Sequence, residues 1–193
     1  GLDVSWRFFS LEETNLEEGQ LHPWERDWSY GWSQMRVGAM LRRSGQDAVD
    51  RWYRAVGAAF HEGARPTQER DVHRAVLAEA GFDPAVVDDA IADPSTADEV
   101  RADHEFAVDA LGGFGVPILN FADGPPVFGP VVAPAPTGDE AVRLWDATLL
   151  FRTFDSLYEL KRPKNADDMG RIATLFEPYL RARSWRSIER PAP

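Results

Sequence analysis

Two hydrophobic periods divide this chain into a strand-like part and a helical part. Val4, Trp6 and Phe8 alternate with polar residues, so we predict a β-strand over residues 3–9. From about residue 30 to residue 111, apolar residues recur every three or four positions, which is the period of amphipathic helices. The pattern therefore predicts one strand followed by a block of consecutive helices.

Residues that favour helix ends and helix starts divide this block. Helices are expected over about 30–60 with one break, over about 67–80, after residue 83, and from about residue 96 to residue 111. The last of these helices has a capping-box arrangement at its start. The residues that mark the boundaries are Ser44-Gly45, Gly81, Asp83-Pro84 and Pro94-Ser95-Thr96 ahead of Asp98 and Glu99.

The pattern changes again after Gly112-Gly113. Residues 117–121 have the composition of a short buried strand, Asp123-Gly124 is a hairpin signal, and a partner strand begins at Val127-Phe128. Two helices are expected beyond the hairpin, the first opened by a capping box of Thr137 and Glu140 and the second over 172–180. This order predicts an α/β fold with an all-helical insertion.

Composition narrows the classes of function. The 193 residues carry a net charge of −11, which disfavours nucleic acid and anionic membrane surfaces as partners. The chain has no cysteine, so it has no disulfide, no zinc–thiolate site and no thiol chemistry of its own. No leader-like segment opens it, so we expect a cytoplasmic protein. His22, His73 and His104 lack the spacing of metal ligands, and we expect no metal site.

An ordered set of motifs carries a family resemblance over about residues 2–164. The chain resembles the DsbA-like thioredoxin superfamily, in the actinobacterial branch that includes mycothiol-dependent nitroreductases and FrnE-like proteins. The residues that carry it are Ser10-Leu11 with Asn15, Phe60-His61, Asp109-Ala110, Gly115-Val116-Pro117, Phe128-Gly129-Pro130-Val131, Leu144-Trp145-Asp146 and Glu159-Leu160-Lys161-Arg162.

The resemblance implies a domain division and a segment that precedes the chain. A thioredoxin-like domain would comprise residues 1–26 and 112–164, with a helical insertion over 27–111 and a C-terminal extension over 165–193. In the family a strand, a cysteine-containing turn and a helix come first, and that strand lies between the strands expected at 3–9 and 117–121. We therefore expect the catalytic cysteine upstream of this chain.

The same resemblance implies the chemistry and its residues. It predicts a thiol-dependent oxidoreductase that binds no cofactor tightly and uses mycothiol, glutathione or a protein dithiol as its partner. It implies a cis peptide bond between Val116 and Pro117 beside the cysteine, where an extended substrate could pair with the exposed backbone. It makes Asn15 a contact to the thiol or substrate, and it places His61 at the active-site cleft.

Structural explanations exist for each of these residues. Asn15 could simply form a loop, His61 could favour the negative end of a helix dipole, and Pro117 could be a trans proline that opens a strand. Two other functions stay open as well. One is a non-catalytic thioredoxin-like binding module, and the other is an enzyme similar to kappa-class glutathione transferases and isomerases. A homodimer is compatible with each of them.

Overall fold

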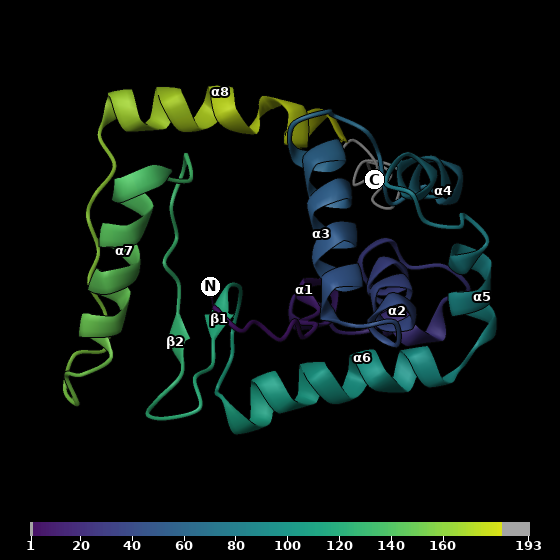
Figure 1. Ribbon diagram of the computed structural model, residues 1–193, viewed down its shortest axis with the longest axis horizontal. Coiled ribbons are helices and arrows are strands. Elements are labelled where there is room, and N and C mark those ends of the chain that lie inside the picture. The colour runs from purple at the N-terminus through teal and green to yellow at the C-terminus, as the bar shows by residue number, and fades with distance from the viewer. Residues whose placement is uncertain (1, 183–193) are drawn as a thin grey trace.

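The structure, a computed structural model, describes residues 2–182 and is mixed α/β but mostly helical (Figure 1). In chain order its elements are α1 (Leu11–Thr14), η1 (Pro23–Glu25), α2 (Tyr30–Arg42), α3 (Gln46–His61), α4 (Arg70–Glu79), α5 (Val86–Ala92), α6 (Ser95–Glu105), η2 (Phe106–Ala110), β1 (Ile118–Leu119), β2 (Val127–Phe128), α7 (Gly138–Phe151) and α8 (Ala166–Ala182).

The hydrophobic core lies in the helical block, where α2 packs against α3, α5 and α6. Trp32 and Trp52 are almost fully buried in it, and Trp24 and Trp28 cover its edge. The predicted breaks are confirmed, because Gly45 separates α2 from α3 and Gly81, with φ +77°, follows α4. Apolar residues at helical spacing therefore fold as expected, each helix turning its apolar side inward.

Arginines on α2 fasten this helix to α5 and α6. The Arg36 guanidinium donates to the carbonyl oxygens of Ala90, Ile91 and Asp93, so it satisfies acceptors that the C-terminal end of α5 leaves open. Arg43 bonds Asp93 at 2.7 Å and Glu99 at 2.7 Å across the same interface.

The prediction of a strand over residues 3–9 is wrong for the part of the chain that the structure describes, because no β-ladder forms there. Side chains take the place of a neighbouring strand along one edge of this segment. The N–H of Trp6 donates to Gln46 Oε1 at 2.8 Å, and the N–H of Phe8 donates to Asp103 Oδ2 at 3.2 Å. The N–H of Ser10 donates to His104 Nδ1 at 3.2 Å.

The predicted hairpin is confirmed, and it lies outside the hydrophobic core of the helical block. β1 and β2 pair antiparallel, with Ile118 opposite Phe128 and Leu119 opposite Val127. The strands are shorter than expected, since residues 117, 120 and 121 lie outside the ladder. Within residues 2–182 these two strands form a two-stranded sheet, so the thioredoxin-like arrangement remains a prediction.

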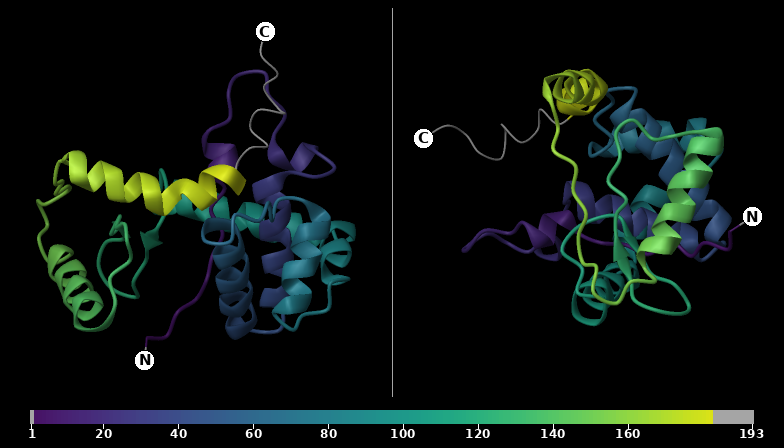
Figure 2. Two further views of the ribbon diagram at one scale, coloured as in Figure 1. Left: turned by 90° about the horizontal axis from the view of Figure 1, so that it is seen from above. Right: turned by 90° about the vertical axis from the view of Figure 1, so that its left-hand side faces the viewer.

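Helix α8 links the two halves of the molecule, running from the side of α7 to the helical block (Figures 1 and 2). At its far end Tyr179 stacks on His61 of α3, with ring centroids 5.1 Å apart and planes 13° apart. Gln68 Nε2 donates to the carbonyl oxygen of Ala182 at 3.0 Å. The last predicted helix is thus confirmed and is longer than the 172–180 expected.

Two predicted capping boxes are wrong, although both helices form. The N–H of Ser95 donates to Asp93 at 2.9 Å, and Thr96 Oγ1 donates to the carbonyl of Ala90. Neither Ser95 nor Thr96 therefore forms a capping box at the start of α6. Thr137 precedes α7 without a side-chain cap bond. Among the described residues, no helix combines the length and apolar character that crossing a membrane requires.

Candidate functional site

The short helix α1 is held against the helical block by the carboxylate of Glu12. Ser10 Oγ accepts the N–H of Glu13 at 3.0 Å and so begins the helix. Glu12 Oε2 accepts the N–H groups of Gly31 at 3.1 Å and Trp32 at 3.0 Å, which places a carboxylate at the positive end of α2. This arrangement leaves Glu13 facing the next feature, a cavity beside α6.

A line of side chains on α6 and η2 forms the second wall of that cavity. Their spacing is three, one, three and one, which puts them on one face of a continuous helical rod. They are Arg101, His104, Glu105, Val108 and Asp109. The face therefore presents three charged groups and one imidazole toward α1.

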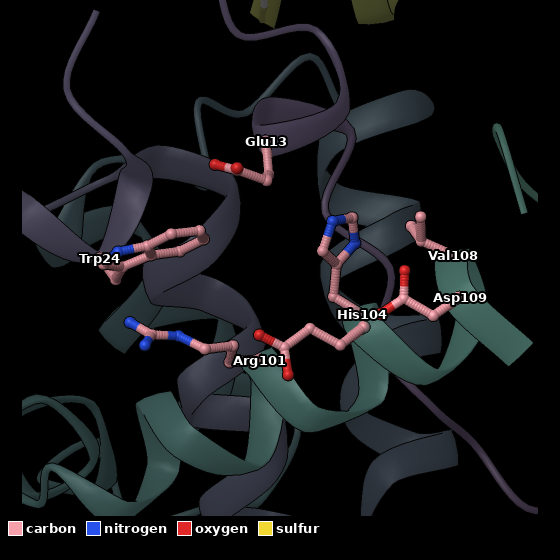
Figure 3. A pocket seen from close by; sticks show the side chains of 7 residues that line it. Glu13, Trp24, Arg101, His104, Val108 and Asp109 are labelled. Atoms are coloured by element: carbon pink, nitrogen blue, oxygen red, sulfur yellow. The ribbon is translucent and has the colours of Figure 1, made fainter.

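The cavity has a volume of about 180 Å³ and is lined by Glu13, Trp24 and the five residues of α6 and η2 (Figure 3). His22 stacks on the ring of Trp24, with ring centroids 4.5 Å apart, and the Arg101 guanidinium lies 4.4 Å from the centroid of the same ring. Glu13 in turn lies 3.0 Å from Nδ1 of His22. These contacts link Trp24 and Glu13 through His22 at the edge of the cavity.

His104 is 8% exposed and its protonation state is set by its neighbours. Because Nδ1 accepts the N–H of Ser10, the neutral ring carries its proton on Nε2. Burial lowers the pKa of His104, although the carboxylates of Glu13, Glu105 and Asp109 act in the opposite direction. Within residues 2–182, Nε2 has no hydrogen-bond partner, so its N–H is available to a ligand in the cavity.

The turn before β1 is the second candidate feature. The peptide bond between Val116 and Pro117 is cis, and the side chain of Val116 is 46% exposed. The carbonyl oxygen of Pro117 accepts the N–H of Gly129 at 2.9 Å, which anchors the turn to the hairpin. In the described part of the chain the backbone of Val116 has no hydrogen-bond partner, so it is free to pair with an added strand.

The other two predicted site residues lie in different places. Asn15 caps the end of α1, and its amide Nδ2 donates to the carbonyl of Leu11 at 2.6 Å. His61 ends α3 and packs against Tyr179 of α8, and partial burial lowers its pKa. The contacts found among residues 2–182 do not bring His61 to Asn15 or to the Val116–Pro117 turn, and the roles of these residues stay predictions.

Comparison with known proteins shows the family to which the chain belongs. The family model described as "Rv2466c-like: Mycothiol-dependent nitroreductase Rv2466c" matches residues 1–162. The chain belongs to the Rv2466c-like family. The "Uncharacterized protein Rv2286c" of Mycobacterium tuberculosis (strain ATCC 25618 / H37Rv) is 48% identical over 190 residues, which covers 98% of this chain and 82% of that protein.

Membership of the Rv2466c-like family connects the site to oxidoreductase chemistry. The matched residues include α1, α6, the cavity and the Val116–Pro117 turn, whereas α8 follows them. The family is named for a reductase that depends on mycothiol, which agrees with the expectation of a small thiol as co-substrate. Among the described residues, no cluster of three or more histidines or carboxylates is arranged to hold a metal ion.

The cavity on α6 is not predicted from the sequence, in which His104 is weighed for metal ligation alone and the stretch before Gly112 is interpreted as one more amphipathic helix. A signal was present, because polar residues at 101, 104, 105 and 109 share one helical face, whereas the core-facing side carries Val100. A polar face of this kind on a half-buried helix indicates that this side of the helix does not pack into the hydrophobic core.

Proposed function

We propose that the complete protein is a mycothiol-dependent oxidoreductase that reduces nitro compounds or disulfides. The observation that carries this proposal is the match of residues 1–162 to the Rv2466c-like family. In the overall reaction two mycothiol thiols lose two electrons and two protons and form a disulfide. The substrate takes up these electrons and protons, so no tightly bound cofactor is needed.

The nucleophile in this proposal is a cysteine that precedes Gly1 in the complete protein. Thiol–disulfide exchange requires a thiolate, which the N-terminus of a helix stabilises. The chain itself contains no cysteine. The matched relative is longer than the matched region, which covers 82% of it, so a homologous protein has room for such a segment.

The proposed thioredoxin-like arrangement has the missing strand between residues 3–9 and residues 117–121, which include β1. In an extended segment the N–H groups of alternate residues point to opposite edges. Trp6, Phe8 and Ser10 use one edge for bonds to side chains, and within residues 2–182 the N–H groups of Arg7 and Phe9 have no partner. The unpaired edge supports an added strand there.

The expected site residues keep their proposed roles around this strand. Val116 offers its backbone to an extended thiol or peptide, and Asn15 contacts the same ligand from the end of α1. His61 would act from the helical insertion. We also propose the domain division into 1–26 with 112–164, then 27–111, then 165–193. A cytoplasmic location and a homodimer stay predictions.

The test compares three proteins in one assay. They are the complete protein with its preceding residues, the same protein with the first upstream cysteine changed to serine, and the 193-residue chain alone. Consumption of a nitroaromatic substrate and formation of mycothiol disulfide are measured together, with glutathione replacing mycothiol as a control for the thiol.

We expect turnover with mycothiol in the complete protein alone. Equal turnover in the serine variant would refute the proposed nucleophile. Binding of the thiol without turnover in the complete protein would instead identify a non-catalytic binding module.

A further inference from the structure

The cavity beside α6 contains hydrogen-bond donors and acceptors that have no partners in the protein. Within the described residues, Arg101, Glu105 and Asp109 form no ion pair, and Nε of Arg101 is buried without a hydrogen-bond partner. His104 adds an N–H on Nε2, from a side chain that is 8% exposed. Glu105 and Asp109 are exposed, whereas Nε of Arg101 is buried. Because buried polar atoms are normally paired, this unpaired atom, at a cavity that other donors and acceptors also line, indicates a polar ligand.

The mixture of these groups selects the kind of ligand. The carboxylates of Glu105 and Asp109 accept hydrogen bonds, whereas the guanidinium of Arg101 and the imidazole of His104 donate them. A hydroxyl group both donates and accepts, so a ring with several hydroxyls can satisfy both sets at once. A purely anionic or purely cationic ligand would satisfy one set and leave the other unpaired.

Charge and size restrict the ligand further. Three carboxylates and one guanidinium line the cavity, and the lowered pKa of His104 keeps its ring neutral, so an anion is repelled. A volume of about 180 Å³ is smaller than pockets for drug-sized ligands, which hold roughly 300–1,000 Å³. It corresponds to about six water molecules at ~30 Å³ each, which suits one six-membered ring.

We propose that this cavity binds a neutral polyhydroxylated six-membered ring, a hexose or a cyclitol. The inference rests on the proposed function, because mycothiol carries its cysteine on an amino sugar joined to a cyclitol. Glu105 and Asp109 lie on the stretch of chain that continues through Gly112-Gly113 to Val116 and Pro117. The cavity would thus hold one ring of the co-substrate, while the Val116–Pro117 turn receives its thiol-bearing arm.

The first experiment measures ring binding in the 193-residue chain and needs no cysteine. The chain is labelled with ¹⁵N and titrated separately with myo-inositol, N-acetylglucosamine, choline and inorganic phosphate. The readout is the indole N–H resonance of Trp24, with that of Trp52 in the core as an internal control. We expect the two polyols to shift the Trp24 signal in a saturable manner and choline and phosphate to leave it unchanged.

Variants locate the binding. The double variant Glu105→Gln with Asp109→Asn alters exposed side chains, and we expect it to weaken polyol binding at least tenfold. Asp98→Asn removes an exposed charge from the first turn of the same helix and should leave binding unchanged. No saturable shift with either polyol, or a shift with choline or phosphate alone, would overturn the proposal.

The complete protein separates this inference from the proposed function. If the double variant raises KM for mycothiol at least tenfold while kcat changes little, the ring site is supported. If the complete protein turns over mycothiol and the double variant has an unchanged KM, the ring site is wrong and the function stands. If polyols bind as expected but no protein containing the upstream cysteine turns over mycothiol, the ring site stands and the function fails.

Discussion

Removing the carboxylate of Asp103 should loosen the N-terminal segment from the helical block. Asp103 is 6% exposed, and it accepts the N–H of Phe8 at 3.2 Å together with a short bond from Arg42. In Asp103→Ala the buried N–H of Phe8 loses its partner, which costs about 1–3 kcal/mol. Arg42 loses a charge-assisted bond worth about 1.5–3 kcal/mol, partly offset because it keeps Glu99 at 3.3 Å.

The free energy of unfolding should therefore fall by about 3–5 kcal/mol in Asp103→Ala, as expected when one partner of a buried pair is removed. The exposed pair of Asp103 with Arg7 adds at most about 1 kcal/mol, since the Arg7 side chain is 59% exposed. Urea unfolding followed by tryptophan fluorescence measures the loss, and Asp98→Ala on the same helix is the control. Hydrogen exchange should show faster exchange of the Phe8 amide. A loss below about 1 kcal/mol, with the Phe8 amide still protected, would contradict the assignment of this bond.

Three further measurements test the packing of the helical block. A Cβ on Gly38 would lie 2.8 Å from Cζ3 of the buried Trp52, so Gly38→Ala should lower the free energy of unfolding by about 1–3 kcal/mol. Gly57 in α3 has open space around it, so Gly57→Ala should raise the free energy of unfolding by about 0.5–1 kcal/mol. Equal urea midpoints for the two variants would exclude this difference. Burial lowers the pKa of His73 to about 4, so the unfolded chain binds the proton more readily than the folded protein does. The neutral ring therefore contributes about 3 kcal/mol of stability, which is fully present above pH 6.5 and should be lost as the pH falls toward 4. Unfolding titrations should show a loss of stability on acidification that is larger in the wild type than in His73→Gln by about this amount, because His61 and His104 contribute to the loss in both proteins. Arg36→Met leaves several acceptors at the end of α5 unpaired and should lower stability by about 2–4 kcal/mol, while Arg54→Met, at an exposed pair on α3, should change the urea midpoint little.

The helices could be predicted because their signals are local. Gly45 and Gly81 interrupt the helical period at the positions where α2 and α4 end, and the Asp123-Gly124 signal lies between the two strands of the hairpin. These residues act through their own backbone preferences, so neighbouring elements do not change the outcome.

The errors concern features that depend on a residue outside the local pattern. Alternation over residues 3–9 predicts a strand, but a strand exists only with a ladder partner, and here Gln46 and Asp103 bond to the backbone. The box expected at Thr96 fails because its hydroxyl bonds to Ala90 instead. The cavity depends on which face of α6 meets α1, and a sequence pattern shows that a polar face exists without naming its neighbour.

Alternate N–H groups of the N-terminal segment donate to Gln46, Asp103 and His104, and these bonds also fix which N–H groups face the other edge of the segment. A slip of one residue would turn the N–H groups of positions 5, 7 and 9 toward these three acceptors and send every side chain to the opposite face. Contacts with the helical block therefore fix the register of residues 6–10, whether or not another strand pairs with them. A strand that joined the free edge would therefore have to match this fixed register.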